Sequence, residues 1–165
     1  GEPPQKKASA QKAADRKALE SIIMTTTTTY LSGDELYDDS FSIDTSEGEF
    51  LGECGVGISY SKSLDEKKQV TAFEAWIFDK TDIQTKTLVL LGSGSYRDME
   101  TQNSLSPKGE LHFLQPRARY YQNTAALTME IDIEDLEYSR NTAFPVNSVI
   151  DRLVLRLTIK RNPMN

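Results

Sequence analysis

The sequence is poor in the residues that most often carry catalysis, metal binding or covalent cross-links. It holds one cysteine, one histidine and one tryptophan among 165 residues. A single cysteine excludes an internal disulfide framework, and a single histidine excludes the usual zinc ligand sets. Cys54 and His112 would have to meet in space to form a nucleophilic pair, and nothing in their spacing indicates that. We therefore expect no catalytic residue and no cofactor, with Cys54 a buried strand thiol and His112 a strand residue that faces solvent.

Long apolar runs and an excess of positive charge are also missing. No apolar run approaches the roughly 20 residues of a membrane helix, and no signal-peptide pattern is visible. The net charge of −6 argues against nucleic acid as the partner, because that binding depends on a basic surface. A composition of 38% hydrophobic and 27% charged residues is ordinary for a globular protein, and the length suits one domain with a proper core.

Residues 1–24 differ in character from the rest of the chain. Residues 6–20 are rich in Ala, Lys and Gln and favour a helix, whereas the Pro-containing residues 1–4 are not expected to be helical. Apolar side chains come only at the end of this segment, at Ala18, Leu19, Ile22 and Ile23. The segment predicts a basic linker running into a short docking helix, ahead of a β-domain over 25–165. Its basic residues would either lie near an anionic membrane surface or belong to a solvated tether.

The stretch 40–59 predicts a β-hairpin around which the domain is organised. Phe41 and Ile43 alternate with polar residues on one side, and a second apolar run begins at Phe50. Between them lies a cluster of turn formers, 44–48, in which Gly48 can adopt a positive φ. Further strands are expected over 25–31, 70–79, 83–91, 111–114, 126–138 and 150–160, with a short helix over 96–104.

Three of these strands have informative patterns. Residues 70–79 are apolar on both faces, which predicts a central or covered strand with Trp76 in the core. The strand 126–138 alternates apolar with acidic residues, and 150–160 alternates apolar with mainly basic ones. As antiparallel neighbours these two would form a ladder of cross-strand ion pairs. The fold class we predict is all-β: a two-sheet antiparallel sandwich of about eight strands, with a short N-terminal helix and one short helix in a connection.

The most unusual feature is an acidic stretch without compensating cations. No Lys or Arg occurs between Lys17 and Lys62, and the interval 34–53 holds eight acidic residues. Calcium prefers several hard oxygen ligands gathered by one loop. The candidate ligands are Asp34, Glu35, Asp38 and Asp39. The stretch lacks the full pattern of a calcium-binding loop. The alternative interpretation is that these acidic side chains are solvated, on turns and on the solvent-exposed face of a strand.

Two further patterns suggest ligands. Residues 92–95 (GSGS) lie between a strand and a helix, which is where phosphate-binding loops occur. They lack the third glycine of the dinucleotide-binding fingerprint and the Gly-Lys-Ser ending of a P-loop. A flexible bend is therefore the alternative interpretation. The aromatic residues could stack against sugar rings, as in carbohydrate-binding sandwiches, with Tyr120 and Tyr121 in a loop. The aromatic residues in question are Tyr60, Trp76, Tyr96, Tyr120, Tyr121 and Tyr138.

Four segments together resemble a group of uncharacterised bacterial proteins: GDELYDDSFSID, GEFLGECGVGI, VTAFEAWIFDKTDIQT and FPVNSVIDRLVL. In that group an N-terminal membrane helix is followed by a basic and Pro-rich linker and a C-terminal β-domain. The resemblance covers most of 29–160 and implies a membrane anchor upstream of Gly1. Basic residues after such a helix imply that the β-domain is cytoplasmic, at the inner face of the membrane. The group brings no activity and no catalytic residue.

The sequence as a whole favours a non-enzymatic interaction or scaffold domain. We expect it to recognise a protein partner of unknown identity through a strand edge or a loop, while tethered at a membrane through its N-terminal linker. A ligand-binding sandwich for carbohydrate or calcium is the alternative. A hydrolase is a third hypothesis, which requires two carboxylates to converge in one cleft.

Overall fold

The computed structural model describes residues 4–163, and at 17–20 it describes the backbone alone. This part of the chain is mostly β, with nine strands in two sheets. The strands are β1 (Ile22–Leu31), β2 (Asp38–Asp44), β3 (Phe50–Leu64), β4 (Lys67–Asp79), β5 (Gln84–Leu91), β6 (Glu110–Phe113), β7 (Arg119–Asn123), β8 (Leu127–Tyr138) and β9 (Ile150–Arg161). The helices are α1 (Pro4–Glu20), the 3₁₀-helix η1 (Ser93–Arg97) and α2 (Met99–Leu105).

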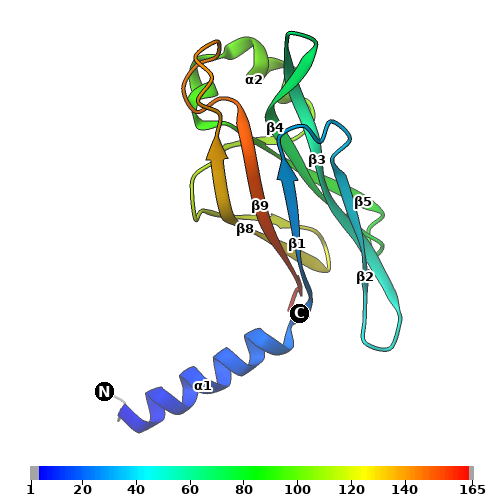
Figure 1. Ribbon diagram of the computed structural model, residues 1–165. Coiled ribbons are helices and arrows are strands. Elements are labelled where there is room, and N and C mark those ends of the chain that lie inside the picture. Colours follow the sequence, from blue (N-terminus) through cyan, green and yellow to red (C-terminus); the bar gives the residue numbers. More distant parts are fainter. Residues whose placement is uncertain (1–3, 164–165) are drawn as a thin grey trace.

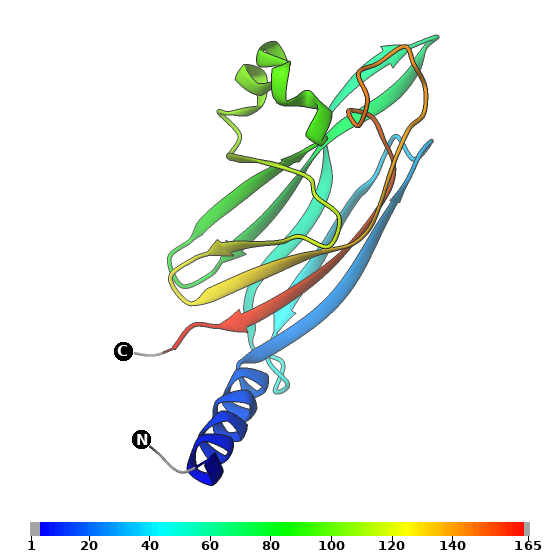
Figure 2. The same ribbon diagram turned by 90° about the vertical axis from the view of Figure 1, so that its left-hand side faces the viewer.

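The strands form a four-stranded sheet, in the order β1-β9-β8-β7, and a five-stranded sheet, in the order β2-β3-β4-β5-β6. The two sheets lie face to face (Figures 1 and 2). All pairs are antiparallel except β5 and β6, which are parallel. The prediction of purely antiparallel sheets was therefore wrong. The reason is the connection that contains η1 and α2, which carries the chain back to the end where β5 begins.

One hydrophobic core fills the space between the sheets. Phe73, Ala75 and Ile77 of β4 are fully buried in it, and β4 is the middle strand of its sheet, as its apolar pattern predicted. The ring of Phe73 packs edge-on against Tyr30 of β1, with 5.0 Å between ring centroids. The alternating apolar residues of β8 and β9 complete the core from the opposite sheet. A smaller cluster, centred on Leu105 of α2, covers part of the outer face of the five-stranded sheet.

The predicted ion-pair ladder is present on the outer face of the four-stranded sheet. Arg156 of β9 contacts Glu134 at 2.9 Å and Asp132 at 3.6 Å, both on β8. Lys160 contacts Glu130 at 2.8 Å, and Arg152 contacts Asp135 at 3.2 Å. Arg119 of β7 extends the ladder to a third strand through Asp132, at 2.6 Å. The charges on this face thus largely offset one another, with four basic side chains against five acidic ones, and their pairing favours this strand register.

Two strand predictions fell short. Tyr120 and Tyr121 lie in the short strand β7 rather than in a loop, because Arg119 and Tyr121 pair with Asp132 and Glu130 of β8. The strands β3 and β4 also extend beyond the predicted limits and meet at a two-residue turn. Asp65 and Glu66 of that turn have φ values of 52° and 64°, the left-handed conformation typical of tight hairpins. The hairpin of β2 and β3 is confirmed, with Gly48 at a φ of 88°.

The N-terminal segment forms a helix with different limits from those predicted. Pro4 lies in the first turn of α1, where its missing N–H costs nothing, so the prediction of a non-helical Pro4 was wrong. Ile22 and Ile23 lie in β1 rather than on a helix face. Ala18 and Leu19 belong to the residues whose side chains are outside the description. The described side chains of α1, from Pro4 to Arg16, are all exposed, and the helix projects away from the two sheets (Figures 1 and 2).

Residues 4–163 include no helix that combines the length and the apolar character needed to cross a membrane.

Candidate functional site

The four predicted calcium ligands do not share a common position. The Asp34 carboxylate accepts a hydrogen bond from the Leu36 N–H at 3.3 Å, and the Glu35 carboxylate accepts one from the Lys68 N–H at 3.3 Å. Asp39 accepts a hydrogen bond from the Thr28 hydroxyl, whereas its neighbour Asp38 points to the other face of β2. Within the described chain, no three His, Cys, Asp or Glu side chains are grouped so that they could hold a metal ion. Calcium binding by Asp34, Glu35, Asp38 and Asp39 stays a prediction that this geometry does not favour.

Cys54 and His112 lie apart in the five-stranded sheet. Cys54 of β3 is fully buried, and burial, together with the charge of Glu53, raises the pKa of its thiol to about 12. It is therefore a thiol at neutral pH, without the thiolate character of a nucleophile. His112 lies on β6, which β4 and β5 separate from β3, and its Nε2 is 3.3 Å from a Glu110 oxygen. These positions do not form a nucleophile and base pair.

The backbone N–H groups of the GSGS segment are all used within the protein. Gly92 donates to the Thr71 carbonyl at 3.0 Å, and Ser93 donates to the Tyr138 hydroxyl at 3.1 Å. Gly94 donates to the Asn147 carbonyl at 2.8 Å, and Ser95 donates to Gly92 at 2.9 Å. A phosphate loop needs free N–H groups that converge on the anion. The segment is instead a packed connection against the β8–β9 loop, and not the flexible bend that its composition indicates.

The aromatic residues are dispersed over the molecule. Trp76 lies outside the core between the sheets, on the outer face of the five-stranded sheet, where its ring is directly over Gly55. On β7 of the four-stranded sheet, Tyr120 donates its hydroxyl to the Phe113 carbonyl at 2.7 Å, whereas Tyr121 is exposed on the opposite face of the same strand. The structure therefore does not bring the predicted residues onto one platform. Trp76 and Phe78 share a face of β4 as alternate residues of the strand.

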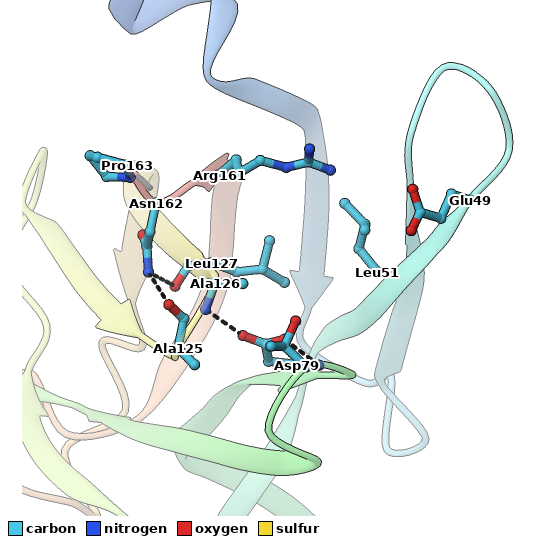
Figure 3. Close-up of a pocket in the computed structure, with 10 residues that line it drawn as sticks. Glu49, Leu51, Asp79, Ala125, Ala126, Leu127, Arg161, Asn162 and Pro163 are labelled. Atoms are coloured by element: carbon cyan, nitrogen blue, oxygen red, sulfur yellow. Dashed lines mark hydrogen bonds between the residues drawn. The ribbon is translucent and has the colours of Figure 1, made fainter. Parts of the chain in front are cut away.

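A pocket opens at one end of the two sheets, near the end of β9 (Figure 3). Its volume is about 550 Å³. Arg161 extends from β9 toward Leu51, and Glu49 lies beyond Leu51 on the opposite wall (Figure 3). The floor is formed by the β7–β8 turn, which Asn162 holds by donating to the Thr124 carbonyl at 2.8 Å. The pocket is lined by Glu49, Leu51, Asp79, Thr81, Ala125, Ala126, Leu127, Arg161, Asn162 and Pro163.

Asp79 is the buried carboxylate of this pocket, and it links the two sheets. It ends β4, and it is fully buried. One carboxylate oxygen accepts hydrogen bonds from the Thr124 hydroxyl at 2.7 Å and from the Ala126 N–H at 2.8 Å, across the gap between the sheets. The other oxygen accepts the Thr81 N–H at 2.8 Å. Asp79 therefore acts as a structural clasp between the β4–β5 turn and the β7–β8 turn.

The hydrogen bonds of Asp79 determine what the pocket can do chemically. Burial by itself would raise the pKa of this carboxyl, but the donors of Thr124, Ala126 and Thr81 together bring the pKa below its ordinary value. A general acid in a glycosidase needs the opposite shift. Glu49, the other carboxylate of the pocket, is exposed on its rim. The pair does not resemble the acid and base of a hydrolase. In place of an acid and base pair, the pocket presents the Arg161 side chain and a partly apolar floor to a ligand.

The strand β1 is a second candidate site, because it forms one edge of the four-stranded sheet. Its only hydrogen-bonded neighbour among the described strands is β9. Thr25, Thr27 and Thr29 are exposed on its outer face, while Thr28 and Tyr30 point into the core. The ten residues of β1 include no charge and no proline.

The backbone of β1 presents free hydrogen-bonding groups along this edge. The Ser32 N–H donates to the Asp151 carbonyl of β9 at 2.8 Å, so the pair Ser32 and Asp151 is of the hydrogen-bonded type. Because such pairs alternate in antiparallel ladders, Thr25, Thr27 and Thr29 direct their N–H and C=O groups away from β9. Together with the threonine hydroxyls, these groups can accept another strand.

No family model, curated protein or solved structure matches this chain. Its function must therefore be inferred from the edge and the pocket themselves. Sequence reasoning missed both sites. The run of threonines in 25–29 predicted a strand but not its place at an edge, and Asp79 was expected only as the last residue of the strand 70–79. Its bond to the Thr81 N–H, two residues ahead, is a local signal, but its partners Thr124 and Ala126 are more than 40 residues away.

Proposed function

We propose that this chain is a β-sandwich that serves as a non-enzymatic protein-interaction domain and binds an extended segment of a protein partner along β1. The observation that carries this proposal is an edge strand of ten residues without charge or proline. Natural sheets normally protect their edges with charges, prolines, bulges or short strands, because an open edge pairs with other strands. An unprotected edge in a stable fold is typical of strand-addition recognition.

The other three edges of the two sheets are protected in these ways. The edge strand β2 carries the acids Asp38, Asp39 and Asp44, whereas β1 carries none; each of the two strands has one irregularity of register near an end. The edge strands β6 and β7 have four and five residues, and β7 begins with Arg119. The contrast with β1 supports a specific role for that one edge. It also gives a matched control position on β2 for the experiment below.

The arrangement of α1 supports a tethering role for the N-terminal segment. The helix joins the domain at the start of β1 (Figure 1), and the charged side chains described on it are mainly basic: Lys6, Lys7, Lys12 and Arg16 against Asp15. We propose that α1 is a spacer that joins the domain to an anchor upstream, and that the domain lies at the inner, cytoplasmic face of a membrane. Such a position would offer β1 to segments of proteins near that membrane.

A proline at position 27 tests the edge. Thr27→Pro removes an N–H that points away from β9, so the sheet should tolerate it while the edge is blocked. Linear peptides selected from a random display library on the wild-type chain should bind Thr27→Pro at least roughly tenfold more weakly, because main-chain hydrogen bonds supply much of the affinity in strand addition. The measurement is a titration by calorimetry or fluorescence anisotropy.

The control for this experiment is Ser40→Pro on β2. Ser40 is exposed. The Ile58 N–H of β3 donates to the Tyr37 carbonyl, so that pair is of the hydrogen-bonded type, and by alternation the N–H of Ser40 points away from β3. This variant should bind the selected peptides as the wild type does. Thermal melts of both variants establish that they fold. Peptides that bind Thr27→Pro and wild type equally would refute the proposed use of β1.

A ligand-binding sandwich is the second candidate, and the place of Trp76 favours carbohydrate as the ligand. Its ring lies on an outer sheet face, over Gly55, rather than in the core. Sugar-binding sandwiches use outward aromatic rings of this kind for stacking. A glycan array should then give a signal that is lost in Trp76→Ala and kept in Tyr121→Ala, which removes an exposed aromatic ring from the other sheet. Absence of any glycan signal from the wild type would eliminate this candidate.

A further inference from the structure

We infer that the polypeptide that occupies the β1 edge is a second copy of this chain, paired antiparallel through the two β1 strands; this rests on the proposed binding at that edge. The first argument is the chemistry of the strand itself. In a two-fold pair each strand meets its own sequence reversed, so a charge near the axis would face a like charge. Such repulsion would affect β2, with its three acids, but not β1, whose ten residues are uncharged.

The backbone of β1 also fits this pairing. Thr25, Thr27 and Thr29 present their N–H and C=O groups to the open edge. With Thr27 on the two-fold axis, Thr27 pairs with Thr27 of the second copy and Thr25 pairs with Thr29. This register gives roughly six backbone hydrogen bonds and places threonine beside threonine on the outer face, a favourable cross-strand combination. The two four-stranded sheets would then form one continuous sheet of eight strands.

The second argument is the complementary charge of α1 and the turn after β1. The described side chains of α1, at positions 4–16, are all exposed, and a helical segment of this length that packs on nothing is marginal in water. The helix ends where β1 begins (Figure 1). In an antiparallel pair, the start of β1 in one copy lies beside the end of β1 in the other copy. The end of α1 that joins β1 therefore lies beside the turn with Asp34 and Glu35 of the second copy.

The two surfaces thus brought together have opposite charges. Lys12 and Arg16 lie one turn apart on α1, toward the end that joins the domain. Asp34 and Glu35 are exposed, and the next residue, Leu36, is 91% exposed. A basic helix against this acidic turn would give the exposed side chains Lys12 and Arg16 a partner of opposite charge. The acidic stretch, which remained without a role in the single chain, would then be a recognition surface for α1.

The experiment is sedimentation equilibrium of the 165-residue chain, with concentrations up to about 100 µM so that a weak dimer is populated. The wild type should be a dimer. Thr27→Lys/Thr29→Lys and Thr27→Glu/Thr29→Glu should each dissociate at least roughly tenfold more readily, because like charges meet at the seam. An equimolar mixture of the two variants should restore the dimer, since the seam then pairs Lys with Glu. Circular dichroism melts verify that each variant is folded.

A second pair of variants lies outside the strands, so the test does not depend on whether β1 tolerates charge. Lys12→Glu/Arg16→Glu should weaken the dimer, and so should Asp34→Lys/Glu35→Lys. Their mixture should restore it, because each helix then meets a turn of opposite charge in both halves of the heterodimer. Raising the salt concentration should reduce these differences.

The outcomes separate this inference from the proposed function. A wild-type chain that remains a monomer overturns the inference, and so does a dimer that none of the four variants weakens, or a mixture of the Lys and Glu variants that does not reassociate. Selected peptides that bind the wild type and lose affinity for Thr27→Pro would still support the edge as a binding site. Conversely, a confirmed dimer stands even if no library peptide binds.

Discussion

Asp79→Ala is expected to destabilise the fold by about 3 kcal/mol, because it leaves three donors without their common acceptor in a fully buried position. Hydrogen bonds to a charged acceptor contribute about 1.5–3 kcal/mol each, and part of this is recovered where water enters the pocket. For a chain of this length the melting temperature should fall by roughly 6–12 °C. Urea unfolding at pH 7 measures the change in the free energy of unfolding.

The matched control is Glu49→Ala in the same pocket. Glu49 is an exposed carboxylate, so its removal should change the free energy of unfolding by no more than about 0.5 kcal/mol. A loss equal to that of Asp79→Ala would mean that the pocket as a whole, and not the clasp of Asp79, supplies the stability. A loss below about 1 kcal/mol for Asp79→Ala would contradict the clasp directly.

The effect of Asp79 should also depend on pH. Its hydrogen bonds hold the folded-state pKa of Asp79 below the ordinary value for aspartate, which is about 3.9. Its contribution to stability is therefore fully present above that ordinary value and is lost as the pH falls through the lower, folded-state pKa. The difference in unfolding free energy between wild type and Asp79→Ala should be constant from pH 7 to about pH 5 and should shrink below about pH 4. A difference that grows on acidification would show that the sign is wrong.

Gly94→Ala is expected to have an effect of similar size, about 3 kcal/mol, for a steric reason. A Cβ at position 94 would overlap the Val146 carbonyl oxygen and would approach the Asn147 carbonyl carbon to 3.0 Å. Both neighbours are backbone, so neither can rotate away as a side chain would. The β8–β9 loop would have to move, with loss of the hydrogen bond from the Gly94 N–H to Asn147. Urea unfolding gives the free energy, and hydrogen exchange over 139–149 locates the change.

The control for Gly94 is Gly48→Ala, the same chemical change in open space. A Cβ at Gly48 meets no atom within 4 Å, and only its φ of 88° opposes a side chain. The cost there should be about 1–2 kcal/mol, from the left-handed backbone alone. If Gly94→Ala costs no more than Gly48→Ala, the close packing of the GSGS segment does not matter for stability. The segment would then deserve renewed consideration as a binding loop.

These results bear on how the sequence should be interpreted. The GSGS segment has the composition of a flexible bend, yet its four N–H groups all have partners within the protein. The glycines and serines show only which backbone conformations the segment can adopt. The β8–β9 loop that packs on the segment comes from residues more than 40 positions later in the sequence. The same limit applies to the strand β7. Its five residues have a weak pattern, and pairing with β8 defines them as a strand.

Other elements were predictable because their determinants are local or periodic. The alternation of apolar with acidic residues in 126–138, and of apolar with basic residues in 150–160, predicted two neighbouring strands, and the ion pairs of Arg156 and Lys160 confirm them. The turn formers of 44–48 predicted the hairpin of β2 and β3. Each of these signals depends on side chains that alternate between two faces, a property that strand geometry imposes directly on the sequence.

The sequence by itself determined that the chain is mostly β, that it has a basic helix ahead of the sheets, and that its single cysteine and single histidine are too few for a disulfide framework or the usual zinc ligand sets. Only the tertiary structure decided that β1 is an unprotected edge, that Asp79 joins the two sheets, and that Asp34, Glu35, Asp38 and Asp39 serve separate hydrogen bonds or faces. The physical reason is the range of the interactions. Alternation and turn formation involve neighbours in sequence, whereas an edge or a clasp exists only once distant strands have packed into sheets.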